Sequence, residues 1–176
     1  MRIPGFITQR LALWANRYMI RHPVYQVITG ETGQDVLIYR WDLLDLPGFH
    51  VRLHSILGSD YGRDLHDHPW WNCTIVLDGR YNEITPWQYG DPYDFGERGA
   101  PDRVMMRETG DVVLRGALAR HRIVLGDRAV HFFDGLPVRF TETPALTLFI
   151  HGRNKRAWGF WKDGQFTPAT KQKVMS

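Results

Sequence analysis

The stretch that decides the fold reads LHDHPWWN, residues 65–72. In an extended strand, side chains two residues apart point to the same face, so His66 and His68 are expected to project together. A third histidine, His121, follows much later in the chain. A neutral imidazole binds metal through one ring nitrogen, and two imidazoles with a third donor begin an open, reactive metal site. The pattern therefore predicts that His66 and His68 are two ligands of one metal ion.

On both sides of this stretch the chain reads as short strands separated by turn residues. Gly30 and Gly33 mark a hairpin-like turn, and glycines or prolines recur between the later apolar segments. Many short strands with such punctuation favour a β-sandwich or a β-barrel. The expected strands are residues 24–28, 36–41, 50–56, 70–77, 81–85, 103–107, 112–114, 121–125, 129–133, 145–150 and 157–161.

The N-terminal segment differs, because its apolar residues recur at helical spacing over residues 7–20. They form one predicted stripe of Ile7, Leu11, Trp14 and Tyr18. The residue before a proline is driven out of the helical region, so Pro23 should end the helix. We expect this helix to lie on the domain or on a second subunit, with membrane-surface binding as the alternative. The predicted organisation is a helical segment 1–22, a barrel domain 23–167 and a flexible tail 168–176.

Bulk properties exclude several classes of protein. The 176 residues fit one domain, and a net charge of +3 does not call for nucleic acid or a membrane surface. A single cysteine, Cys73, leaves no intrachain disulfide and favours the cytoplasm. The longest apolar stretches are far too short to span a bilayer. Residues 87–101, rich in aromatics, glycine and charge, are either a binding loop or a plain surface excursion.

The spacing around the first histidine pair resembles the first motif of the cupin superfamily, G-x5-H-x-H-x3-E-x6-G. His66, His68, Asn72 and Gly79 occupy its last four positions. Two departures stand out, because Asp60 replaces the first glycine and Asn72 replaces the glutamate that usually completes the metal site.

The second motif of that superfamily, G-x5-P-x-G-x2-H-x3-N, is matched in its spacing further along. Gly110 and His121 keep the family residues, whereas Gly116, Leu118 and Leu125 stand at the proline, glycine and asparagine positions. The resemblance covers about residues 65–125 with their flanking strands.

The resemblance implies an all-β fold, a jelly-roll barrel or double-stranded β-helix, here with an N-terminal helix. It further implies that His66, His68 and His121 ligate one divalent transition metal inside the barrel, near one mouth. An amide oxygen is a weak ligand for such a metal, so we expect three histidines plus water, with Asn72 orienting the water or the substrate. Three neutral ligands leave the charge of the ion uncompensated, which favours an anionic substrate or hydroxide.

Further candidates for the site come from neighbouring positions. Trp70 shares the predicted histidine face and would wall the cavity, and His54, on a preceding strand, is expected to face the same cavity, with a structural role as the alternative. Cys73 and Trp71 should point away from the ligands. An arginine inside the barrel, such as Arg52, would clamp a carboxylate or phosphate, although a rim position is the plainer interpretation.

Two functions of different classes follow. The first is a metal-dependent enzyme acting on a small, anionic molecule. With Fe(II) it is a non-haem dioxygenase, which we favour, and with Zn, Mn or Ni a redox-neutral isomerase or hydrolase. The second is a non-catalytic barrel that binds or senses a small molecule, with or without metal. We also expect a homodimer, because cupin-like barrels often pair through N-terminal segments and the apolar helix stripe would be costly to leave in water.

Overall fold

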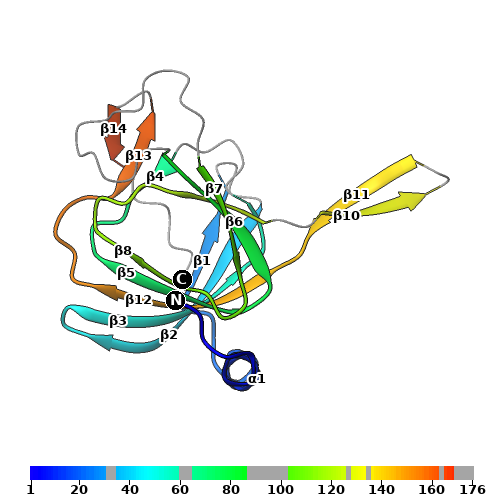
Figure 1. Cartoon of the computed structure of the whole chain (residues 1–176), viewed down its shortest axis with the longest axis horizontal. Coiled ribbons are helices and arrows are strands. Elements are labelled where there is room, and N and C mark those ends of the chain that lie inside the picture. Colours follow the sequence, from blue (N-terminus) through cyan, green and yellow to red (C-terminus); the bar gives the residue numbers. More distant parts are fainter. Residues whose placement is uncertain are drawn as a thin grey trace.

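The computed structural model describes residues 1–30, 35–59, 65–86, 103–125, 128–133, 136–162 and 165–168. One helix is followed by antiparallel strands that curl into a barrel (Figure 1). The elements are α1 (Gly5–Arg21), β1 (Gln26–Thr29), β2 (Val36–Leu46), β3 (Phe49–Ile56), β4 (Leu65–His66), β5 (Asn72–Asp78), β6 (Arg80–Thr85), β7 (Arg103–Glu108), β8 (Val112–Arg115), β9 (Arg122–Leu125), β10 (Arg128–Phe133), β11 (Leu136–Glu142), β12 (Ala145–Gly152), β13 (Gly159–Lys162) and β14 (Gln165–Pro168).

The largest sheet has the strand order β1-β2-β3-β12-β5-β8, and two smaller sheets have the orders β7-β6-β9 and β14-β13-β4. Strand β12 lies between β3 and β5, far from both in sequence, which is a crossover typical of jelly rolls. Strands β10 and β11 form a two-stranded ribbon that extends away from the barrel (Figure 1). The predicted fold class, an all-β jelly-roll barrel with an N-terminal helix, is confirmed.

The large sheet separates two apolar cores, because side chains alternate along each strand. On β5, Leu77 faces outward and packs with Ala12 and Ala15 of α1, whereas Val76 faces inward and packs with Tyr81. Burying one such aliphatic side chain contributes about 1.5–3 kcal/mol. The outer core fixes the helix on the sheet, and the inner core fills one end of the barrel.

The helix is confirmed, but the predicted stripe is wrong at two of its four positions. Ile7 and Trp14 are exposed, whereas Thr8, Ala12 and Ala15 are buried against the sheet. Small side chains let the helix axis approach the strands closely, so the larger apolar residues one position away remain outside. The apolar periodicity predicted the helix but not which of its faces packs on the sheet.

The strand prediction missed three strands and one strand boundary. Strands β4, β11 and β14 were not expected, and β5 begins at Asn72 rather than at residue 70. Pro69 has no backbone N–H to give to a ladder, so the chain bends before β5 starts. Asp60, the segment 87–101 and the tail beyond residue 168 lie outside the described residues.

Gly79 and Gly110, which match glycines of the two motifs, are required by the backbone conformation at their turns. Gly79 has φ 77° and Gly110 has φ 95°, a left-handed region that favours glycine. A Cβ on Gly79 would lie 2.5 Å from the carbonyl oxygen of Pro144, and one on Gly110 would lie 2.7 Å from that of Ile3. The spacing of these motifs therefore reflects turn geometry as well as the site.

Candidate metal centre

The three histidines of the motifs meet inside the barrel. His66, His68 and His121 each offer one ring nitrogen, and these nitrogens lie within 4.8 Å of one another. The Nε2 atoms of His68 and His121 are 3.0 Å apart. Residues from two motifs that lie far apart in sequence thus converge on one point.

Backbone pairing brings the two motifs together. The N–H of His66 donates to the carbonyl of His121, and the N–H of His121 donates to that of His66, both at 2.9 Å. This isolated bridge aligns the short strand β4 with the residue that precedes β9. His68, however, lies in the bend beyond β4, so the expectation that both histidines of the pair project from one strand is wrong.

A buried carboxylate between the two histidines connects this segment to distant parts of the chain. Asp67 has no exposed surface and accepts hydrogen bonds from Nε1 of Trp161, at 2.6 Å, and from Arg156, at 3.1 Å. Arg156 also donates to the backbone carbonyls of His68, at 3.2 Å, and of Ala117. This clamp ties the first histidine pair to the turn that precedes His121.

A second buried carboxylate orients His121. Glu83 on β6 accepts a hydrogen bond from Nδ1 of His121 at 3.1 Å and one from Nε of Arg115 at 2.5 Å. Because Nδ1 carries the proton, Nε2 of His121 has a lone pair, and this atom lies 3.0 Å from Nε2 of His68. A carboxylate behind a metal-binding histidine fixes its tautomer and its ring orientation in this way.

The electrostatics of the centre suit metal binding. Burial lowers the pKa of His121 to about 3, although the hydrogen bond to Glu83 opposes the shift. Burial, reinforced by His121 and His66, lowers the pKa of His68 well below its ordinary value. Burial alone would raise the pKa of Glu83, but the hydrogen bond with His121 and the charge of Arg115 outweigh it, so the pKa lies far below its ordinary value. At neutral pH the rings of His68 and His121 are neutral and the carboxylate of Glu83 is ionised, which fits a divalent cation.

Asn72 is connected to the centre through Arg115, which also bonds to Glu83. Its side chain is buried on β5, and Oδ1 accepts a hydrogen bond from Arg115 at 3.2 Å. Its Nδ2 group has no hydrogen-bond partner among the described residues. Because Arg115 donates to Oδ1 of Asn72, Nδ2 is the atom of this amide that can donate to a ligand.

The other two predicted site residues lie further from the histidines. The Trp70 ring centroid is 6.0 Å from that of His68 and stacks on His151 at 4.3 Å. His54 stacks on Phe149 at 4.8 Å, and the Phe149 ring is 5.9 Å from that of His68. His54 is therefore separated from the three histidines by one aromatic ring. Trp71 was expected to point away from the ligands, and its side chain is half-exposed.

The sequence did not indicate that Arg115 and Arg40 lie on the inner side of the barrel. Arg115 is buried with Glu83, and it also donates to Thr74 at 2.8 Å. Arg40 on β2 shares the inner face of the sheet with His54, its register partner on β3. Arg52, singled out from the sequence, pairs with Asp42 at 2.7 Å. No sequence signal distinguished the buried arginines, because burial depends on which strands pair.

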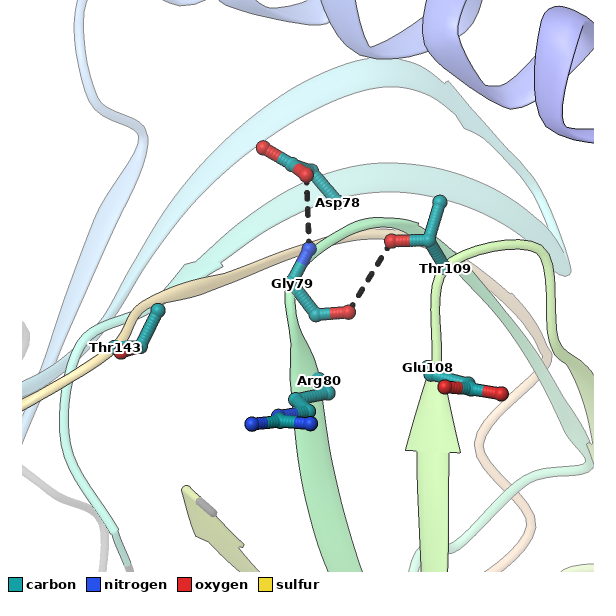
Figure 2. Close-up of a pocket in the computed structure, with 6 residues that line it drawn as sticks. All are labelled: Asp78, Gly79, Arg80, Glu108, Thr109 and Thr143. Atoms are coloured by element: carbon teal, nitrogen blue, oxygen red, sulfur yellow. Dashed lines mark hydrogen bonds between the residues drawn. The ribbon is translucent and has the colours of Figure 1, made fainter. Parts of the chain in front are cut away.

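A pocket of about 340 Å³ lies at the turn between β5 and β6 (Figure 2). Its lining includes Gly79, whose carbonyl accepts a hydrogen bond from Thr109 at 3.2 Å, and Arg80 beside it. None of the three histidines lines it. It is a surface feature of the turn and not the candidate metal centre.

Comparisons with known proteins find only distant similarities. No protein-family model matches the chain, and no curated protein sequence matches it significantly. Among solved structures, the polyketide cyclase RemF from Streptomyces resistomycificus is similar at 16% identity, a TM-score of 0.46 and coverage of 68% of each chain. KdgF from a Halomonas species is similar at 13% identity and a TM-score of 0.46, over 78% of this chain and 93% of that one.

A cupin superfamily protein from Desulfitobacterium hafniense is similar at 11% identity and a TM-score of 0.41, over 74% of this chain and 81% of that one. The likeness is one of fold and says nothing about activity. The strand order of this chain is itself that of a jelly-roll barrel, preceded by one helix. In the part of the chain that the structure describes, no helix is long and apolar enough to cross a bilayer.

Proposed function

We propose that this chain is a metal-dependent enzyme that acts on a small, anionic molecule at His66, His68 and His121. The observation that carries the proposal is the convergence of three ring nitrogens within 4.8 Å, one of them oriented by a buried carboxylate. A histidine that served only as a core residue would not need Glu83 to leave its Nε2 free. The outer contacts are those of a prepared ligand set.

The three histidines would hold one divalent transition metal. When bound, such an ion supplies Lewis-acid activation of a substrate oxygen or, as Fe(II), chemistry with O2. Fe(II) and a dioxygenase reaction are our first choice, and Zn, Mn or Ni with an isomerase or hydrolase reaction is the close variant. Asn72 would orient a water molecule or the substrate through Nδ2, and Trp70 would help to exclude bulk water.

A non-catalytic barrel that binds or senses a small molecule is the second candidate. The observation that favours it is Asn72, because the position that usually supplies an anionic ligand holds an amide already engaged by Arg115. The two candidates differ in turnover but share the ligand set, so metal binding is tested first.

The test is elemental analysis after reconstitution with Fe(II), Zn, Mn and Ni. Wild type should hold about one ion per chain, and His66→Ala and His121→Ala should hold almost none while keeping a cooperative unfolding transition. His22→Ala, at an exposed histidine outside the barrel, is the matched control and should hold as much metal as wild type. A wild-type protein without metal above background would end the enzyme proposal.

Assembly and location remain predictions. The side of α1 that faces away from the sheet exposes Phe6, Leu13, Trp14 and Ile20, and we propose that it contributes to a homodimer in the cytoplasm. Light scattering after size exclusion checks this, and a monodisperse monomer would contradict it. Nucleic acid is not an expected partner, because the basic run 153–156 is largely a solvated surface turn.

A further inference from the structure

The inner face of the large sheet carries buried nitrogen atoms that bond to nothing in the described structure. They are Nε of Arg40, Nε2 of His54, Nε2 of His151 and Nε1 of Trp70. Buried polar groups in folded proteins are almost always hydrogen-bonded, and each exception requires an explanation. Arg40, Trp70 and His54 can each donate from these atoms, whereas Nε2 of His151 can only accept, because its Nδ1 donates to the carbonyl of Gly152. The exceptions on this wall point to a ligand that supplies the missing partners.

These nitrogens belong to one connected surface. Arg40 and His54 are register partners on β2 and β3. The His54 ring stacks on Phe149, whose centroid is 5.6 Å from that of His151, and His151 stacks on Trp70. A single wall therefore runs from Arg40 through aromatic rings to Trp70.

The charge on this wall is unbalanced. Arg52 is paired with Asp42 at 2.7 Å, whereas Arg40 donates a hydrogen bond to the neutral Oε1 of Gln26 at 3.1 Å. Burial, reinforced by Arg52, lowers the pKa of Arg40 to about 10, so its guanidinium stays charged at neutral pH. Nε of Arg40 is buried, and Asp42, whose charge also acts on Arg40, is already paired with Arg52. An anion bound beside Arg40 would balance its charge.

The wall ends next to the three histidines. The rings of Trp70 and Phe149 lie 6.0 and 5.9 Å from that of His68. One small molecule bound to Arg40 would therefore extend along an apolar, aromatic stretch toward the metal centre.

We infer that Arg40 and His54 form a subsite for an anionic oxygen group, a carboxylate or a phosphate, of a small molecule whose apolar part lies along Trp70 and Phe149. The inference rests on the proposed function, since it assigns a substrate class to that same centre. Arg40 supplies the charge, His54 supplies a neutral donor, and the metal centre receives the opposite end of the molecule.

The test is calorimetric titration with benzoate, phenyl phosphate and benzamide, which share an aromatic ring and differ in the group attached to it. Each is titrated into zinc-loaded protein and into protein stripped with a chelator. Metal-free wild type should bind at least one of the two anions about tenfold or more tightly than neutral benzamide. The tighter anion identifies the group as carboxylate or phosphate.

Arg40→Gln should weaken that anion by about tenfold or more, whereas Arg153→Gln, which removes the same charge from an exposed turn, should leave it unchanged. Equal affinity for the anions and benzamide, or anion binding that disappears with the metal, would overturn the subsite even if Arg40→Gln failed to fold. Metal content is measured on the same samples. Metal without anion selectivity ends the subsite alone, and anion selectivity without metal ends the enzyme proposal alone.

Discussion

The two faces of the large sheet are built from the same strands and differ in almost every physical property. The outer face packs Trp41, Leu53 and Leu77 against the small residues of α1, and its contacts are apolar. The inner face carries Arg115 and Asn72, which are buried and joined by a hydrogen bond. Arg115 also bonds to the buried Glu83, which comes from a strand of another sheet. One face is optimised for packing, whereas the other tolerates buried charge and unpaired donors. Such tolerance is expected where a protein binds a ligand.

The largest effect should come from breaking the charge balance of the inner face. Arg115→Met leaves Glu83 buried with less compensation and should lower the free energy of unfolding by about 3–5 kcal/mol. Arg107→Met is the matched control, since Arg107 also pairs with Glu83 at 2.7 Å but is partly exposed. Urea unfolding of both variants measures the difference. Equal losses would mean that burial of Arg115 does not set its contribution.

On the outer face, a packing defect should affect stability and leave the metal centre unchanged. Leu77→Ala should lower the free energy of unfolding by about 2–5 kcal/mol, because it opens a cavity under α1. Leu114→Ala, at a leucine that is 73% exposed on β8, should cost less than about 0.5 kcal/mol. Unfolding experiments combined with metal analysis check both points. A loss of metal from Leu77→Ala would show that the faces are coupled.

A smaller effect is expected from the contact that orients His121. Glu83→Gln should reduce metal affinity by about 10–100-fold, since an amide is a poorer partner for Nδ1–H than a carboxylate. Competition against a chromogenic chelator measures the affinity. Glu108→Gln, at a carboxylate that pairs with Arg2 on the surface, should bind metal as wild type does. Unchanged affinity in Glu83→Gln would remove the carboxylate from the metal site.

The smallest effect concerns the neutral histidines of the inner face. Burial, reinforced by Arg52, His50 and Arg40, lowers the pKa of His151 to about 4 from an ordinary 6.5, against the hydrogen bond with Gly152. Between these values the unfolded chain binds a proton that the folded chain does not, so stability is complete above pH 6.5 and falls as the pH drops toward 4.

The slope from one such histidine is about 1.4 kcal/mol per pH unit at most. Urea unfolding of chelator-treated protein from pH 7 to pH 4 should therefore show a shallower pH dependence in His151→Gln than in wild type. His22→Gln, at an exposed histidine, should follow wild type. Identical slopes in all three proteins would show that His151 does not stay neutral in the folded state.

The sequence alone determined the features that depend on local spacing. Periods of two and of 3.6 residues predicted a strand-rich barrel and one helix, and the motif spacing placed His66, His68 and His121 in one centre. The periodicity of a single element follows from backbone geometry alone. The grouping of His121 with the first histidine pair came from the resemblance to the cupin motifs.

Only the tertiary structure decided which side chains from distant elements contact one another. The burial of Arg115 and Arg40, the orientation of His121 by Glu83 and the clamp on Asp67 all join elements distant in sequence. The face of α1 that meets the sheet was likewise fixed by the approach of Ala12 and Ala15, not by the size of the apolar residues. Strand register and helix placement result from the packing of the whole barrel, and no short segment of sequence contains that information.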